Sequence, residues 1–152
     1  MRVEIGVFFA EGPLTEEDAL RRHRACCAGI AAEPEEPVSA PHLDPFLDDL
    51  TERYPALDSL TADQREQSPW ARRFDVNGDQ AVITLNGRKC AEAVDLIMNL
   101  AERHGLVCFD PGTRSILSAP PGVQVEDPAG RAVWPLVLAT LSLALIGVLL
   151  PH

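Results

Sequence analysis

The sequence predicts an α+β domain with a small, mainly antiparallel sheet, helices on one face of that sheet, and a C-terminal transmembrane helix. Segments rich in β-branched and aromatic residues alternate with segments of helical periodicity in the order β-α-α-β-β-α-β-β. The dipeptide Asn77-Gly78, a strong hairpin signal, lies between two β-type segments and indicates antiparallel neighbours. We therefore expect a globular domain over residues 1–117, a linker rich in proline and glycine over 118–131, and a transmembrane tail anchor over 132–150.

The chain begins with a predicted strand and helix. Residues 3–9 (VEIGVFF) are rich in β-branched and aromatic side chains, which is typical of a strand. Thr15 and Asp18 have the spacing of an N-terminal capping box, and Gly29 is placed to end the helix that follows. Residues 31–41 contain three prolines and three glutamates, so we expect them to form a loop.

A second helix is predicted to start at Asp44-Pro45, because Asp is a favoured N-cap and proline suits the first helical turn. Pro55 ends this helix. Residues 57–67 are polar and acidic, with room for one short helical turn. Residues 72–76 and 80–85 then supply the two strands of the hairpin.

The clearest helix of the sequence covers residues 88–104, where apolar side chains recur at helical spacing. Gly105 supplies a left-handed C-terminal cap. Residues 106–110 (LVCFD) predict a strand, Pro111-Gly112 a turn, and residues 113–117 a short last strand.

The C-terminal 21 residues contain no Asp, Glu, Lys or Arg. In residues 132–150, 15 of 19 side chains are apolar, and a helix of that length nearly spans the roughly 30 Å hydrocarbon core of a bilayer. Trp134 suits the headgroup layer, and Arg131 on the domain side agrees with a cytoplasmic domain. Because only Pro151-His152 follow, we expect a tail anchor. The alternative is a buried core helix, which a small domain would struggle to enclose.

The formal charge of −10 is concentrated in one region of the chain. Residues 31–66 hold ten acidic and two basic residues, a net charge of −8. This acidity argues against nucleic acid as a partner, because nucleic-acid binding requires Lys and Arg to replace condensed counterions. It suits either a solvated face or attraction of a basic protein.

The chain has four cysteines, Cys26, Cys27, Cys90 and Cys108. Without a CxxC pair or a signal peptide, they predict free thiols in a reducing compartment. Zinc sites typically show paired Cys or His spacings, which are missing here. Residues 75–79 resemble the start of a calcium loop, but Asn86 stands where such a loop needs its closing glutamate. We therefore expect no metal and no cofactor.

His104 and Cys108 allow two interpretations. A thiol-dependent enzyme would use Cys108 as nucleophile and His104 as base. The other interpretation is a buried structural cysteine and a histidine favoured at the end of a helix. We expect no catalytic residues and keep the thiol enzyme as the alternative. His23 and His42 have no partner at a recognisable spacing.

Four segments of the sequence together resemble those of a known group of proteins. They are the first strand, the 46–55 segment with Phe46, Leu50 and Tyr54-Pro55, the run Ser68-Pro69-Trp70-Ala71, and HGLVCFDP at 104–111. Over about residues 3–117 they resemble a widespread group of small uncharacterised bacterial proteins, common in actinobacteria. That group usually carries Gln after its Asp-Pro, where this chain has Gly112. The resemblance implies a shared fold and no transferable catalytic residue, and its members are similar in size to immunity proteins that neutralise toxins.

We expect a non-enzymatic, tail-anchored domain that binds another protein, of an immunity-like or regulatory kind. The candidate partner-binding residues are Asp44, Asp48, Asp49, Glu52 and Trp70. The four carboxylates would steer a basic partner, and a partly exposed tryptophan would anchor it. The alternative for Trp70 is a side chain packed on the core.

Overall fold

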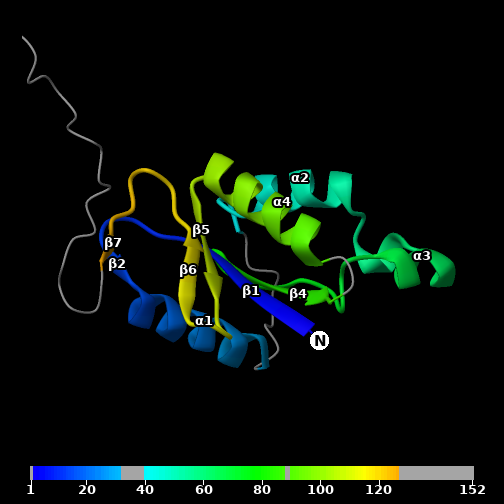
Figure 1. The fold of residues 1–152 in the computed structure, drawn as a ribbon, viewed down its shortest axis with the longest axis horizontal. Helices are drawn as coiled ribbons and strands as arrows, with labels where there is room; N and C mark the ends of the chain where they lie inside the picture. Colours follow the sequence, from blue (N-terminus) through cyan, green and yellow to red (C-terminus); the bar gives the residue numbers. More distant parts are fainter. Residues whose placement is uncertain (1, 32–39, 88–89, 127–152) are drawn as a thin grey trace, which may run out of the picture.

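The computed structural model describes residues 2–31, 40–87 and 90–126. Its elements are β1 (Arg2–Phe9), β2 (Leu14–Thr15), α1 (Glu16–Ala31), α2 (Asp44–Arg53), the 3-10 turn η1 (Leu57–Ser59), α3 (Ala62–Gln67), β3 (Asp75–Asn77), β4 (Gln80–Asn86), α4 (Cys90–Arg103), β5 (Leu106–Asp110), β6 (Ser115–Ser118) and β7 (Val125–Glu126) (Figure 1). The segment over 132–150, predicted to span a membrane, lies outside the described residues. Within the described ranges, no helix has both the length and the apolar character needed to cross a membrane.

Five strands form one sheet in the order β3-β4-β1-β5-β6, and every neighbouring pair is antiparallel. The strand β1 lies at the centre of this sheet, where Val7 pairs with Ala81 of β4 on one side and with Cys108 of β5 on the other. A separate pair, β2 and β7, is parallel. The predicted α+β class with a mainly antiparallel sheet is confirmed.

Helices cover both faces of the sheet, so the expectation of helices on one face is wrong (Figure 1). Ile5 and Val7 of β1 pack in one core cluster with side chains of α2 and α4. Phe8 points to the opposite face, where it packs with Phe109 of β5 and Ala19 of α1. The reason is that Val7 and Phe8, neighbours on β1 that point to opposite faces, are both apolar, so neither face can be left to water at this end of the strand.

The start of α1 agrees with the sequence prediction, but its end does not. Thr15 Oγ1 accepts a hydrogen bond from the Asp18 amide at 3.1 Å, and Asp18 Oδ2 accepts one from the Thr15 amide at 3.3 Å, as a capping box requires. Gly29 does not end the helix, which continues to Ala31. A Cβ atom at Gly29 would collide with the side-chain amide of Asn77, so this glycine allows the helix to approach the hairpin closely.

The predicted hairpin is confirmed, with a different turn. Asn77 pairs with Gln80, so the central residues of the turn are Gly78 and Asp79. Gly78 has a φ of 58°, whereas Asp79 does not have a positive φ. One positive φ at the first central position is the pattern of a type II′ turn, not of the expected type I′.

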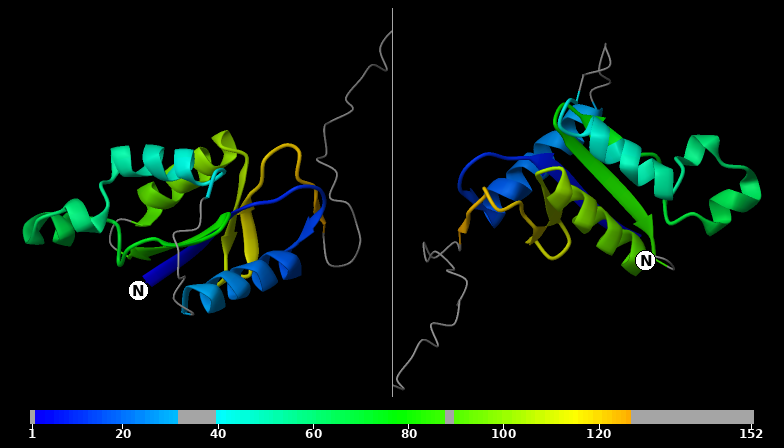
Figure 2. Two further views of the ribbon diagram at one scale, coloured as in Figure 1. Left: turned by 180° about the vertical axis from the view of Figure 1, so that it is seen from behind. Right: turned by 90° about the horizontal axis from the view of Figure 1, so that it is seen from above.

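The parallel pair of β2 and β7 lies at one end of the domain, where the described part of the chain ends at Glu126. Leu14 of β2 pairs with Val125 of β7, and Val123 packs on the core cluster that contains Phe8. Part of the predicted linker thus lies against the domain, since Ala119 and Val123 pack on this cluster and Val125 belongs to β7. This pair and α3 lie at opposite ends of the molecule (Figure 2).

Phe46→Ala tests the packing of α2 on the sheet. Phe46 is fully buried, and truncation of a buried Phe is expected to lower the free energy of unfolding by about 3–5 kcal/mol. Urea denaturation followed by circular dichroism measures the change. Asp48→Ala, on the exposed side of the same helix, is the control and should change stability by about 0.5 kcal/mol or less. Equal, small effects of both changes would contradict the packing described.

Candidate functional site

One side of α2 is a stripe of carboxylates. Phe46 and Leu50 turn into the core and are fully buried, so the other side of the helix faces water. Asp44, Asp48 and Glu52 follow one another at intervals of four residues, and all three are exposed. None of the three forms an ion pair with a base in the part of the chain that the structure describes. We call these three residues the acidic stripe.

Asp49, predicted to act with them, has a structural role. Its Oδ2 atom lies 2.8 Å from Nε2 of His104 and 3.9 Å from a guanidinium nitrogen of Arg103, at the end of α4. The His104 ring also packs edge-on against Phe46, with centroids 6.4 Å apart. Asp49 therefore joins α2 to α4 and is less available to a partner than the acidic stripe.

Trp70 lies in the core, so its predicted role as a partly exposed anchor is wrong and the packing alternative is confirmed. The side chain is 2% exposed, and its Nε1 donates a hydrogen bond to the Tyr54 carbonyl at 3.1 Å. Its ring makes edge contacts with Tyr54 and Phe74. The cause is a β-bridge between Trp70 and Leu85, which lays this segment along β4 and turns the indole inward.

Cys108 is not placed to act as a nucleophile. Its side chain is fully buried, and its Sγ lies 3.9 Å from the Ile97 carbonyl oxygen. Burial raises the pKa of the Cys108 thiol to about 12, which disfavours the reactive thiolate. His104, its predicted base, is hydrogen-bonded to Asp49 instead. These contacts fit the interpretation of a structural cysteine and a histidine at a helix end.

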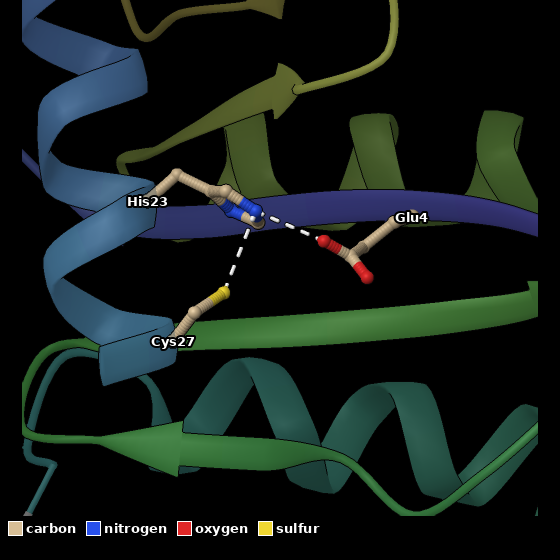
Figure 3. A group of neighbouring side chains, drawn as sticks. All are labelled: Glu4, His23 and Cys27. Atoms are coloured by element: carbon tan, nitrogen blue, oxygen red, sulfur yellow. Dashed lines mark hydrogen bonds and ion pairs between the residues drawn. The ribbon is translucent and has the colours of Figure 1, made fainter. Parts of the chain in front are cut away.

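A second polar group, which no sequence motif predicted, lies between β1 and α1. Glu4 projects from β1, and His23 and Cys27 project from α1 toward it (Figure 3). Glu4 Oε1 lies 2.9 Å from His23 Nε2, and Cys27 Sγ lies 3.6 Å from the same nitrogen. The three polar atoms all lie within 4.8 Å of one another. We call these residues the Glu4–His23–Cys27 cluster.

The backbone explains how the cluster is assembled. His23 and Cys27 are one helical turn apart and share a side of α1, while Glu4 lies on the α1 face of the strand. Gly6 leaves room for the imidazole, because a Cβ atom there would lie 2.9 Å from His23 Nδ1. His23 is 6% exposed, and its Nδ1 has no hydrogen-bond partner among the described residues. The Glu4 side chain is 37% exposed, so solvent reaches the cluster from this side.

The sequence alone could have paired two of the three cluster residues, His23 and Cys27, but not Glu4 with them. His23 has a partner four residues later, Cys27, so the expectation that it lacks one at a recognisable spacing is wrong. Glu4 interrupts a strand that is otherwise largely apolar, which marks it as unusual. Only the packing of α1 against the sheet brings the carboxylate to the other two side chains.

Further charges surround the cluster. Arg72 forms an ion pair with Asp75 at 2.6 Å and donates a hydrogen bond to Thr84 Oγ1 at 2.9 Å. Burial raises the pKa of the Cys27 thiol; the negative charge of Glu4 raises it further, Arg72 opposes the rise, and Asp75 adds to it. Cys27 is consequently a neutral thiol at neutral pH in the absence of a cation.

No protein-family model, curated protein or solved structure matches this chain. The resemblance to small actinobacterial proteins therefore stays a prediction.

The four thiols should differ in reactivity when the folded protein is pulsed with iodoacetamide at pH 7.5 and its peptides are analysed by mass spectrometry. Cys90 is half-buried and should be modified, whereas Cys26 and Cys108 are buried and should react only after unfolding. Cys27 is also half-buried, but its raised pKa lowers the thiolate fraction, so it should be modified more slowly than Cys90. A parallel pulse in denaturant shows that all four peptides can be detected. Modification of Cys108 in the folded protein at the rate of Cys90 would contradict its placement.

Proposed function

We propose that this chain is a membrane-tethered domain of an immunity-like or regulatory kind that binds a basic protein through the acidic stripe of α2. The observation that carries the proposal is the set of three exposed carboxylates at Asp44, Asp48 and Glu52 without a basic partner in the described structure. They project from a helix whose opposite side is fixed in the core, so their spacing is rigid. A rigid row of like charges favours a partner with a complementary row of Lys or Arg.

The charge of the surrounding segment supports this proposal. Residues 40–66 contain seven acidic and two basic residues, a net charge of −5 within a chain of −10. Of these, Asp58 is paired with Arg73 at 2.7 Å, and Asp49 is paired as described. The remaining carboxylates produce a negative potential that would speed encounter with a positive surface and would weaken as salt is added.

The position of the tether also suits this role. The β2–β7 pair holds the described chain at Glu126, at the end of the molecule opposite α3 (Figures 1 and 2). If residues 132–150 span a membrane, their attachment leaves the α2–α3 end of the domain free. The competing proposal of a thiol enzyme built on Cys108 and His104 gains no support from the geometry, because the thiol is buried and the imidazole is bound to Asp49.

Charge reversal of the acidic stripe tests the binding proposal. The triple variant Asp44→Lys, Asp48→Lys and Glu52→Lys in the full chain should lose chemical crosslinking to a basic protein in detergent-solubilised membranes. Wild-type crosslinking should fall between 50 and 300 mM salt, because screening weakens exposed charge pairs. Asp49 is left unchanged because its removal would also disturb the contact with α4.

The matched control reverses three exposed carboxylates at the other end of the molecule, in Glu11→Lys, Glu17→Lys and Glu126→Lys. It makes the same change in net charge and should retain the crosslink. Equal loss in both triple variants would show a dependence on net charge alone, and retention in the α2 variant would refute a role for the acidic stripe.

The tether is tested by alkaline carbonate extraction of membranes. The full chain should stay in the pellet, and Leu141→Arg with Leu143→Arg should release it, because each Arg near the centre of a membrane helix costs about 2.5–3.5 kcal/mol. The control pair Leu141→Ile and Leu143→Ile preserves the apolar character and should remain in the pellet. Extraction of the full chain by carbonate would rule out a membrane span.

A further inference from the structure

We infer that Glu4, His23 and Cys27 form a binding site for a zinc-like divalent cation, with one coordination position open to solvent. This inference is independent of the proposed function, since the cluster lies on the α1 face of the sheet and the acidic stripe lies over the other face. It also departs from the expectation of no metal, which rested on spacings within the sequence.

The donor set selects the class of cation. One carboxylate oxygen, one imidazole nitrogen and one sulfur are the ligands that zinc takes in proteins. Calcium and magnesium prefer oxygen ligands throughout, so a site with sulfur and nitrogen donors disfavours them. Cys27 would bind as the thiolate, and the proton of its S–H group would pass to the buffer when the metal–sulfur bond forms.

The arrangement of the three atoms is close to that of a coordination shell. Bonds of about 2.0–2.3 Å in a tetrahedral site place neighbouring ligand atoms roughly 3.3–3.7 Å apart. The distance from Cys27 Sγ to His23 Nε2 is 3.6 Å, within this range. The distance from Glu4 Oε1 to the same nitrogen is 2.9 Å, so the carboxylate has to withdraw by a few tenths of an ångström. Its partly exposed side chain has the freedom to do so.

The same geometry argues against a catalytic relay. In a thiol–imidazole–carboxylate triad, the thiol and the carboxylate contact opposite nitrogens of the ring. Here both contact Nε2 of His23, and Nδ1 is turned toward Gly6 without a hydrogen-bond partner among the described residues. Three donors that converge on one point are placed to hold a cation, not to pass a proton along a chain.

The surroundings indicate an exchangeable site with an accessible metal. Glu4, a Cys27 thiolate and Asp75 supply negative charge, and Arg72 balances one of these charges. A bound divalent cation would neutralise the two negative charges that remain. Metal-ligating histidines usually donate their second ring N–H to a partner, and loss of that partner typically weakens binding by about 10–100-fold. Because Nδ1 lacks one among the described residues, we expect weaker binding than at a structural zinc site.

Metal titration of the purified full chain under reducing conditions tests this inference. Zn²⁺ is titrated in competition with a chromogenic chelator, and Co²⁺ is used as a spectroscopic substitute whose sulfur-to-metal absorption reports thiolate ligation. The wild-type chain should bind one ion, show the thiolate band and unfold at a higher temperature with Zn²⁺. Cys27→Ser should remove the band, and Cys27→Ser and Glu4→Gln should each weaken zinc binding at least tenfold.

Cys90→Ser is the matched control, because it removes another half-buried thiol outside the cluster and should bind like the wild type. Circular dichroism checks that each variant is folded, and the partly exposed Glu4→Gln variant provides the test if Cys27→Ser does not fold. Failure of the wild-type chain to bind, or an unchanged affinity and thiolate band in Cys27→Ser, would overturn the site. Neither result would affect the binding proposal for the acidic stripe, which uses different residues and a different readout.

Discussion

The central strand β1 has to be covered on both faces, and much of the architecture follows from that requirement. Ile5 and Val7 on one face and Phe8 on the other are each at most 1% exposed. Because β4 and β5 flank this strand on both sides, only helices above and below the sheet can exclude water from it. Helices α2 and α4 cover one face and α1 covers the other, which places the acidic stripe and the Glu4–His23–Cys27 cluster on opposite sides of the sheet.

The α1 face is apolar in one half and polar in the other. Phe8 packs with the apolar side chains of β5, whereas Glu4, two positions away from Gly6 on the same face, lies beside Thr84 of β4. Burying polar groups costs free energy unless they are hydrogen-bonded, and the contacts of His23 with Glu4 and Cys27 reduce that cost. Part of this cost remains, because Nδ1 of His23 is buried and has no hydrogen-bond partner among the described residues. This polar half of the α1 face holds the three donor atoms of the proposed cation site.

Helix α2 combines two roles because its opposite sides meet different environments. Phe46 and Leu50 hold it to the sheet, and Asp49 ties its flank to the end of α4 through His104. These contacts leave the acidic stripe on a helix that cannot easily rotate or shift. The rigid row of charges is thus a consequence of the core packing beneath it, which connects the stability of this helix to the proposed recognition of a partner.

Local signals in the sequence predicted most of the helices and strands, because each depends on residues close together in the chain, but not the short strands β2 and β7, whose paired residues are 111 positions apart. The capping box at Thr15, the hairpin at Gly78 and the strand over Leu106–Asp110 are confirmed, as is the mainly antiparallel α+β class. Contacts between distant segments were decided only by the tertiary structure. The bridge to Leu85 buries Trp70, His104 pairs with Asp49, and Glu4 reaches His23 across nineteen positions of the sequence. Periodicity and spacing specify which side of an element is apolar, but they do not specify which element it meets, since that depends on how all the apolar faces are buried together.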